Sequence, residues 1–207
     1  MRDIAIFTRF YKTDNLPAIR ENLKTVLGEN GVSYYHFLIP DLTKATEDTI
    51  ADCATFLDNK GTVGLYYGYK KSFTDPFNIR GINGAFWRYR YIEDLFEYCY
   101  VLDDDNLLKD NFHEGLRKAQ EIESKLFIIN LERKSSQKWS CLRNLTEYSR
   151  GIDFASFLVR WDVVNDMHYV ESKEGDTDSV NLWMANGIKP DYYGKVCGYY
   201  NKLNPDY

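Results

Sequence analysis

The stretch Cys99-Tyr100-Val101-Leu102-Asp103-Asp104-Asp105-Asn106 joins a short apolar run directly to three consecutive carboxylates. The apolar run predicts a buried strand, with the three aspartates at its carboxyl end. Open α/β sheets bind their ligands outside the carboxyl ends of the strands, so a functional site is expected here. If the segment stays extended, Asp103 and Asp105 point to one side and Asp104 to the other.

These carboxylates are expected to bind a divalent metal ion. Like charges a few ångström apart repel strongly unless a cation compensates them. Hard oxygen ligands favour Mg²⁺, Mn²⁺ or Ca²⁺, and Mg²⁺ is often held by one or two carboxylates together with water and substrate phosphates. The sequence therefore predicts Mn²⁺ or Mg²⁺ at Asp103 and Asp105. A solvated acidic turn is the structural alternative, whereas an EF-hand loop is disfavoured because Leu107 and Leu108 stand where a ligand and a glycine belong.

Upstream of the aspartates, apolar runs alternate with amphipathic segments. This alternation implies crossover connections and a mostly parallel central sheet flanked by helices, which is the α/β class with Rossmann-like topology. The predicted strands are 4–10, 34–39 and 62–67, and the predicted helices are about 15–28, 46–57 and 83–98. The ends of these strands place the expected site near Thr8 and Asp41.

Downstream, the pattern continues with a helix over about 111–123, strands at 125–131 and 153–159, and a polar loop up to about 151. The last third is acidic, then helical, then rich in tyrosine. No linker or repeat divides the 207 residues, so a single domain is expected.

Composition narrows the range of functions. A formal charge of −5 gives no general field for a polyanion, so nucleic acid is not an expected partner. No signal peptide and no apolar stretch long enough for a bilayer are visible, so a cytoplasmic protein is expected. The four scattered cysteines are expected to be reduced thiols, and the three histidines to be structural.

The segment from Tyr100 to Asn106 resembles the DxD motif of GT-A glycosyltransferases, in which an acidic pair binds a metal bridging the diphosphate of a nucleotide sugar. Similarity to family 2-like enzymes extends over almost the entire chain. Residues 4–9 are similar to their opening strand, and 80–84 to the loop and helix start before the DxD strand. Residues 155–161 resemble the strand that ends in a basic residue on the acceptor side.

The acidic segment 171–178, together with 182–187, resembles the family's "ED-x-D … helix … G" pattern. Asp176 matches the aspartate of that motif, while Gly175 stands where the family usually has glutamate. In inverting members, the carboxylate of this motif deprotonates the acceptor hydroxyl. Residues 175–178 could instead simply cap the following helix.

The resemblance implies one GT-A domain over 1–207, with a nucleotide-sugar-binding half at 1–106 and an acceptor-binding half at 107–207. It implies a metal-dependent transferase that moves a sugar from a nucleoside-diphosphate sugar, expected to be a UDP-sugar, to a hydroxyl of a glycan or another acceptor. The implied catalytic residues are Asp176 and Asp178, and the metal ligands are Asp103 and Asp105. The nucleotide sugar would contact Thr8, Arg9, Asp41, Arg80, Asn83, Asp103 and Asp104, and the acceptor would contact Arg160 and Trp161.

Three other functions stay open. A nucleotidyltransferase would bind a nucleoside triphosphate and metal on a similar sheet, but the segment 8–12 lacks the expected glycine-rich loop. A metal-dependent phosphohydrolase would place its aspartate after the first strand. A non-catalytic carbohydrate-binding module would suit the 17 tyrosines but would not need the acidic triplet.

Overall fold

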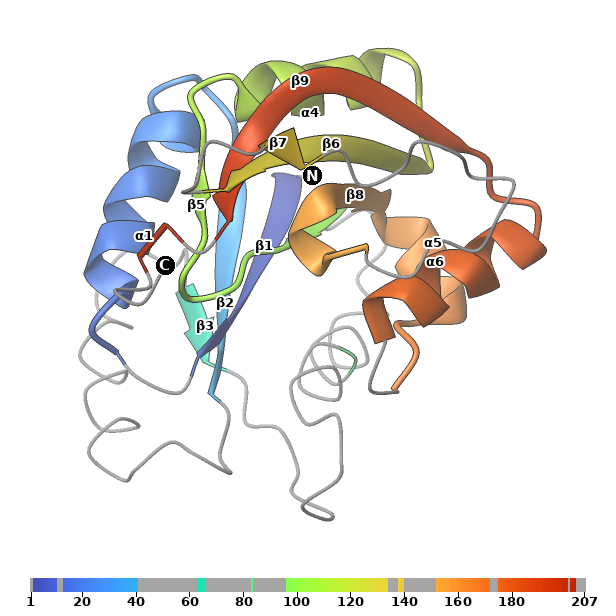
Figure 1. The fold of residues 1–207 in the computed structure, drawn as a ribbon, viewed down its shortest axis with the longest axis horizontal. Helices are drawn as coiled ribbons and strands as arrows, with labels where there is room; N and C mark the ends of the chain where they lie inside the picture. The colour runs from blue at the N-terminus through green and yellow to red at the C-terminus, as the bar shows by residue number, and fades with distance from the viewer. Residues whose placement is uncertain are drawn as a thin grey trace.

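The computed structural model describes residues 2–10, 13–40, 63–65, 83, 96–133, 138–139, 152–171, 175–200 and 202–203 (Figure 1). Within them, nine strands form one sheet in the order β3-β2-β1-β4-β8-β6-β9-β5, and β7 pairs with β6. The sheet and its helices make up a single mixed α/β domain. No helix in these ranges is long and apolar enough to cross a bilayer.

The first half of the sheet is parallel, as the alternating pattern predicts. Its strands are β1 (Arg2–Phe10), β2 (Tyr34–Pro40), β3 (Val63–Leu65) and β4 (Phe96–Val101). β2 and β4 both run parallel to β1, with Phe7 opposite Phe37 on one side and Val101 on the other. The carboxyl ends of β1 and β4 therefore meet at the same edge of the sheet.

The second half contains antiparallel pairs. Its strands are β5 (Leu107–Leu108), β6 (Leu126–Arg133), β7 (Lys138–Trp139), β8 (Phe157–Arg160) and β9 (Pro190–Tyr200). β8 runs antiparallel to β4 and to β6, while β9 runs parallel to β6 and closes against β5. Because β8 is reversed, its start rather than its end lies at the edge where β1 and β4 finish.

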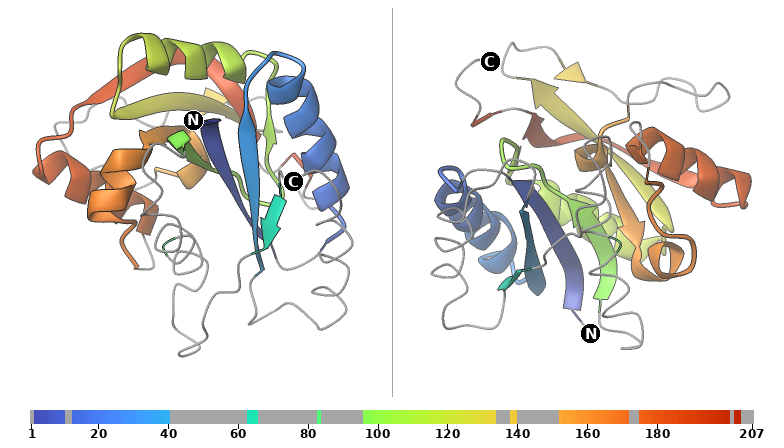
Figure 2. Two further views of the ribbon diagram at one scale, coloured as in Figure 1. Left: turned by 180° about the vertical axis from the view of Figure 1, so that it is seen from behind. Right: turned by 90° about the horizontal axis from the view of Figure 1, so that it is seen from below.

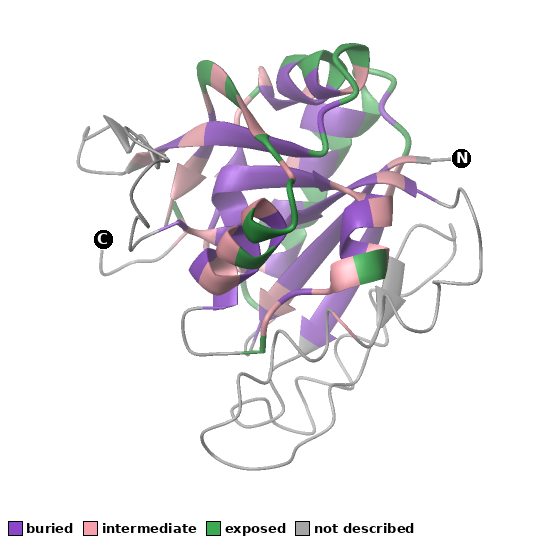
Figure 3. Ribbon diagram, turned by 90° about the vertical axis from the view of Figure 1, so that its right-hand side faces the viewer, coloured by how far each residue is buried: buried purple, intermediate pink, exposed green. Residues whose placement is uncertain are grey.

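Helices cover both faces of the sheet (Figures 1 and 2). α1 (Leu16–Leu23), which continues as a π-helical turn (Lys24–Gly28), packs with α4 (Phe112–Glu121) on one face. α5 (Trp161–Met167) and α6 (Gly175–Ala185) contribute to the core on the other face. Figure 3 shows the central strands largely buried and many exposed residues on the helices, while β9 is only partly buried. Each buried Leu, Ile or Phe in these layers stabilises the fold by roughly 1.5–3 kcal/mol.

Alternation along β1 assigns its side chains to the two cores. Ile4 and Ile6 belong to the core beneath α1 and α4, and Ala5 and Phe7 belong to the opposite core. Thr8 and Arg9 continue the alternation, so their side chains point to opposite faces of the sheet.

Several predicted elements differ from the structure. The helix expected over 83–98 cannot reach Tyr98, because β4 begins at Phe96. The strand expected from Asp153 starts only at Phe157, after a 3₁₀ turn (Phe154–Ser156). α5 and β9 were not predicted, and the tyrosine-rich tail that forms β9 lacks clean alternation. The helix expected over 46–57 lies outside the described residues.

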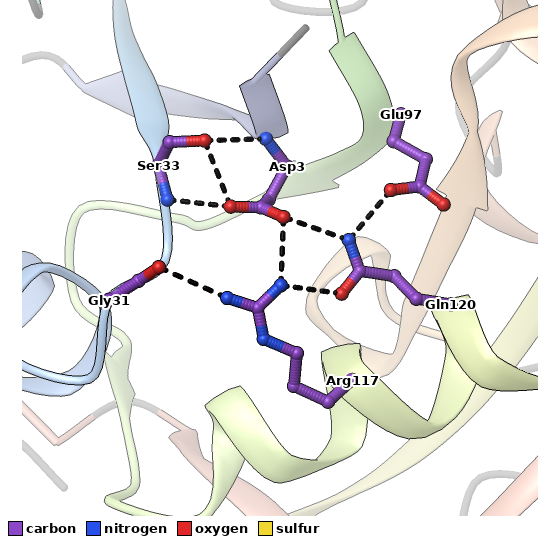
Figure 4. Close-up of polar contacts among 6 residues, drawn as sticks. All are labelled: Asp3, Gly31, Ser33, Glu97, Arg117 and Gln120. Atoms are coloured by element: carbon purple, nitrogen blue, oxygen red, sulfur yellow. Dashed lines mark hydrogen bonds and ion pairs between the residues drawn. The ribbon is translucent and has the colours of Figure 1, made fainter.

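A polar network ties the amino ends of β1 and β2 to α4 (Figure 4). Its members are Asp3, Gly31, Ser33, Glu97, Arg117 and Gln120. The Asp3 carboxylate accepts hydrogen bonds from the Ser33 N–H at 2.7 Å, from Arg117 at 2.8 Å and from Gln120 at 2.9 Å. This end of the sheet is thus held by charges and polar groups that satisfy one another.

Candidate active site at the carboxyl end of the sheet

Arg9 and Asp103 form an ion pair where β1 and β4 end. The two strands stay joined past β4, because the Leu102 N–H donates to the Phe7 carbonyl at 2.9 Å. Arg9 Nε donates to Asp103 Oδ1 at 2.6 Å, and Arg9 Nη2 contacts the same oxygen. The side chains are 19% and 22% exposed, so a ligand can still reach them.

The three aspartates lie in a turn rather than in an extended segment. The Asn106 N–H donates to the Asp103 carbonyl at 3.1 Å, which places Asp104 and Asp105 in the middle of the turn. The expectation that strand alternation separates Asp104 from its neighbours is therefore wrong. The Asp105 carbonyl accepts a bond from the Leu203 N–H at 2.9 Å, so the segment after β9 anchors the turn.

A fourth aspartate, Asp153, reaches this edge because β8 is reversed. It caps the 3₁₀ turn before β8 by accepting a hydrogen bond from the Ala155 N–H at 2.8 Å. The next residue, Phe154, presents its ring to Arg9, whose guanidinium carbon lies 4.9 Å from the ring centroid. The Tyr100 hydroxyl donates to the Ala155 carbonyl at 2.7 Å and fixes the turn to β4.

Asp176 joins the cluster from the start of α6. Its carboxylate accepts a hydrogen bond from the adjacent Thr177 N–H at 2.8 Å. Its charge also interacts with Arg9 and with Asp103. Asp178 lies in the same first helical turn and is half-buried. The helix start that the sequence marked as acidic thus approaches the acidic turn after β4.

Three carboxylates of this cluster have pKa values raised above that of an ordinary aspartate. Burial, reinforced by the charge of Asp103, raises the pKa of Asp105. The same two causes, in the same order, raise the pKa of Asp153 to about 7. Burial raises the pKa of Asp176 as well, again with a contribution from Asp103. Arg9 opposes all three shifts but does not cancel them.

Thr8 is turned away from the cluster. Its side chain is fully buried, and its hydroxyl lies 2.9 Å from His36 Nε2. Burial lowers the pKa of His36 to about 3, so this histidine is neutral and structural, as expected. The structure therefore places the Thr8 hydroxyl in the core rather than at a ligand-accessible position.

Asn83 holds the chain after α5. Its amide donates to the Tyr169 carbonyl at 2.8 Å and to Glu171 Oε1 at 3.2 Å, while its oxygen accepts from the Tyr169 N–H at 3.0 Å. Tyr169 in turn packs edge-on against Phe154 and Trp183, with ring centroids 5.3 Å apart in both pairs. Asn83 thus supports the aromatic layer beside the cluster.

The structure does not bring Arg160 and Trp161 to the site. Arg160 pairs with Tyr98, five residues before Asp103, which corresponds to roughly 16 Å along the strand. Its guanidinium binds Asp162, with an Nε–Oδ1 distance of 3.0 Å. Trp161 packs on Phe96 at 4.9 Å between ring centroids. The resemblance implied that these two residues line the acceptor side, but β8 is antiparallel to β4, so its end points away from the edge that carries the aspartates.

Asp104, which was predicted to contact the nucleotide sugar, is half-buried within the acidic turn. Asp41 and Arg80 lie outside the described residues. The 3₁₀ cap Asp153 and its neighbour Phe154 were missed by sequence reasoning, because both stand inside a segment that looked like an ordinary strand. An aspartate directly before the apolar run was the available signal for a cap.

The donor set fits a metal ion only in part. Asp103 and Asp105 supply hard oxygen ligands from one turn, and the effect of Asp103 on the pKa of Asp105 shows that their charges interact. Across the described ranges, no group of three or more His, Cys, Asp or Glu side chains is arranged to hold a metal. The residues therefore fit a site of two carboxylates completed by water and substrate phosphates, not an all-protein cage.

Comparison with known proteins was informative at the level of structure. No family model and no curated protein matches the sequence. The chain is similar to a crystal structure of S. aureus TarS 1–349, a glycosyltransferase, with a TM-score of 0.69 and 13% identity over 95% of this chain and 60% of that one. The fold is GT-A-like.

Two further crystal structures of S. aureus TarS 1–349 are similar to this chain. The complex with UDP gives a TM-score of 0.69 over 96% of this chain and 60% of that one. The complex with UDP-GlcNAc gives 0.66 over 96% and 58%. Identity is 13% in both cases, so the likeness defines the fold alone. This chain spans about 60% of the length of the TarS fragment.

Proposed function

We propose that this chain is a glycosyltransferase that takes a sugar from a nucleoside-diphosphate sugar, most simply a UDP-sugar, and transfers it to an acceptor hydroxyl on a glycan. The observation that carries the proposal is the convergence of Arg9, Asp103, Asp153 and Asp176 at the carboxyl end of a GT-A-like sheet. Such sheets bind nucleotides at this edge. The complexes of TarS with UDP and UDP-GlcNAc support the choice of donor.

In this proposal the acidic turn would hold the donor through a Mn²⁺ or Mg²⁺ ion. Asp103 and Asp105 would be the protein ligands of that ion, together with the bound nucleotide. When bound, the ion neutralises charge that develops on the leaving nucleoside diphosphate. Residues 1–106 supply these groups, which agrees with their proposed role as the donor half.

Asp176 is the proposed general base. The bond from the anomeric carbon to the phosphate oxygen breaks, the acceptor oxygen bonds to that carbon, and the acceptor proton moves to the Asp176 carboxylate. A base needs a pKa closer to neutrality than that of an ordinary aspartate, and burial shifts the pKa of Asp176 in that direction. Asp178, in the same turn of α6, is the second candidate from the acidic motif.

Asp153 is the competing candidate for this role. Its pKa, raised by burial to about 7, also suits proton transfer. Each carboxylate accepts one backbone hydrogen bond, Asp153 from Ala155 and Asp176 from Thr177, so hydrogen bonding does not separate the two candidates. We assign Asp176 to catalysis because it matches the acidic motif, and Asp153 to support of the Arg9–Phe154 contact.

A donor screen tests the proposal. The protein would be melted with Mn²⁺ and each of a set of UDP-, GDP-, ADP- and CMP-sugars, and hydrolysis of each donor would be recorded. A ligand at a hundredfold excess over its Kd stabilises the folded state by about 2.7 kcal/mol, so even modest binders shift the melting temperature.

Each outcome of the screen has a meaning. Stabilisation by one nucleotide sugar together with its slow hydrolysis supports a transferase. Stabilisation by free sugars without any nucleotide would favour the carbohydrate-binding module instead. Release of pyrophosphate from a nucleoside triphosphate would favour a nucleotidyltransferase.

A further inference from the structure

Arg9 is built into the acidic cluster more firmly than a surface arginine. Two of its nitrogens contact a single oxygen of Asp103, with Nε at 2.6 Å. Its guanidinium also lies over the Phe154 ring at 4.9 Å, and Phe154 itself is buried. An arginine held between a carboxylate and an aromatic face has few alternative conformations.

Arg9 also supplies part of the charge compensation that the cluster requires. It pairs directly with Asp103, and its positive charge also interacts with Asp153 and Asp176. A divalent ion approaching the acidic turn therefore meets an occupied Asp103 oxygen and a nearby positive charge. Both effects weaken binding of the ion to the protein alone.

We propose that Arg9 makes divalent-ion binding conditional on the nucleotide. With no nucleotide present, Arg9 neutralises Asp103 and the ion binds weakly. A nucleoside diphosphate brings its own oxygen ligands and negative charges, so the ion and the nucleotide bind together. This inference rests on the proposed donor site, and it assigns Arg9 a positioning role that the DxD motif alone does not contain.

The test measures Mn²⁺ affinity by isothermal titration calorimetry, first without nucleotide. Arg9→Met keeps an apolar stem on Phe154 and removes the charge, so it should bind Mn²⁺ about tenfold more tightly than wild type. With saturating UDP the difference between the two proteins should shrink. Arg160→Met is the matched control, because Arg160 pairs with an aspartate in a similar way but at the other edge of the sheet, and its Mn²⁺ affinity should equal that of wild type.

The outcomes separate this inference from the proposed function. If Arg9→Met binds Mn²⁺ no more tightly than wild type without nucleotide, Arg9 does not control ion binding, and the donor site can still stand. If wild type fails to bind UDP with Mn²⁺, the donor site itself is wrong. Should circular dichroism show that Arg9→Met is unfolded, Arg9→Gln replaces it, since glutamine is neutral yet can still donate to Asp103. Unchanged Mn²⁺ affinity in the glutamine variant then overturns the inference.

Discussion

Aspartates near the two ends of strand β1 have pKa values that are shifted in opposite directions. At the amino end, burial tends to raise the pKa of Asp3, but hydrogen bonds from Gln120 and Ser33 and the charge of Arg117 together lower it (Figure 4). At the carboxyl end, burial and the neighbouring Asp103 raise the pKa of Asp105, of Asp153 and of Asp176, despite Arg9.

The difference separates a structural end from a functional one. A network that satisfies its own charges gains nothing from a ligand and contributes to stability. A cluster that leaves negative charge uncompensated loses stability on its own and gains it when a cation or a substrate arrives.

Removing the proposed metal ligands should abolish nucleotide binding. Asp103→Ala and Asp105→Ala should each weaken UDP binding in the presence of Mn²⁺ by roughly a hundredfold or more, because even outer-shell partners of metals are worth 10–100-fold. Calorimetric titration with UDP measures the loss. Asp3→Ala, at the other end of β1, should leave the affinity near that of wild type. Asp104→Ala should have the smallest effect of the three acidic residues, and equal losses at all three positions would contradict a two-ligand site.

Asp176→Asn should separate binding from chemistry. UDP and Mn²⁺ affinities should stay close to those of wild type, while transfer to the acceptor should fall by about 10²-fold, as expected for loss of a general base. A helix-capping role would survive the change, because asparagine also caps well. Steady-state transfer assays decide between the two roles. Transfer near the wild-type rate would remove Asp176 from catalysis and leave Asp153 as the acid to test.

The contributions of Asp3 and Asp153 to stability should depend on pH with opposite signs. The lowered pKa of Asp3 gives stability that is present above its unfolded pKa and is lost as the pH falls, so Asp3→Asn should destabilise by roughly 1–2 kcal/mol at neutral pH and have little effect in acid. The pKa of Asp153, raised to about 7, means that ionisation of this group costs stability as the pH rises from about 4 to 7. Asp153→Asn should therefore stabilise by about 1–2 kcal/mol at alkaline pH, with no gain in acid.

Urea unfolding of both variants and of wild type across this pH range provides the check. For each variant, the difference in free energy of unfolding from wild type is plotted against pH. If these differences change in the same direction for Asp3→Asn and Asp153→Asn, the two ends of β1 do not differ in their electrostatics.

Thr8→Val should affect stability alone. The change removes the partner of His36 in the core and should cost about 1–2 kcal/mol, while UDP affinity stays unchanged because the hydroxyl faces away from the cluster. Thermal melting and UDP titration on the same sample measure both quantities. Weaker UDP binding at unchanged stability would instead restore Thr8 to the donor site that its position at the end of β1 suggested.

Local sequence patterns were sufficient for the parts of the fold that depend on neighbouring residues. The apolar run of β1 and the acidic turn after β4 could be predicted because each consists of residues that are contiguous in the sequence. Asp176 was found through the resemblance of the segment 171–187 to the acidic motif of GT-A enzymes. The helix expected up to Tyr98 was wrong because β4 is aromatic on both faces, and a strand buried on both sides has no period of two.

The direction of β8 could not be predicted from its sequence, and it decides which residues reach the site. The residue pattern of an apolar segment does not show whether the strand pairs parallel or antiparallel with its neighbours. Reversal brings Asp153 to Asp103 and carries Arg160 away, so one missed tertiary feature accounts for both errors. The pairing of Arg9 with Asp103, 94 residues apart, is equally a product of the fold.

A crystal structure of the protein with UDP and Mn²⁺ would show whether the acidic turn holds the donor. We expect an ion within about 2.0–2.6 Å of carboxylate oxygens of Asp103 and Asp105, as is usual for hard cations on oxygen ligands, with the diphosphate on its open side. The Asp3 network at the other end of β1 should stay as it is. UDP bound away from the acidic turn, or an ion held without either aspartate, would rule out the proposed donor site.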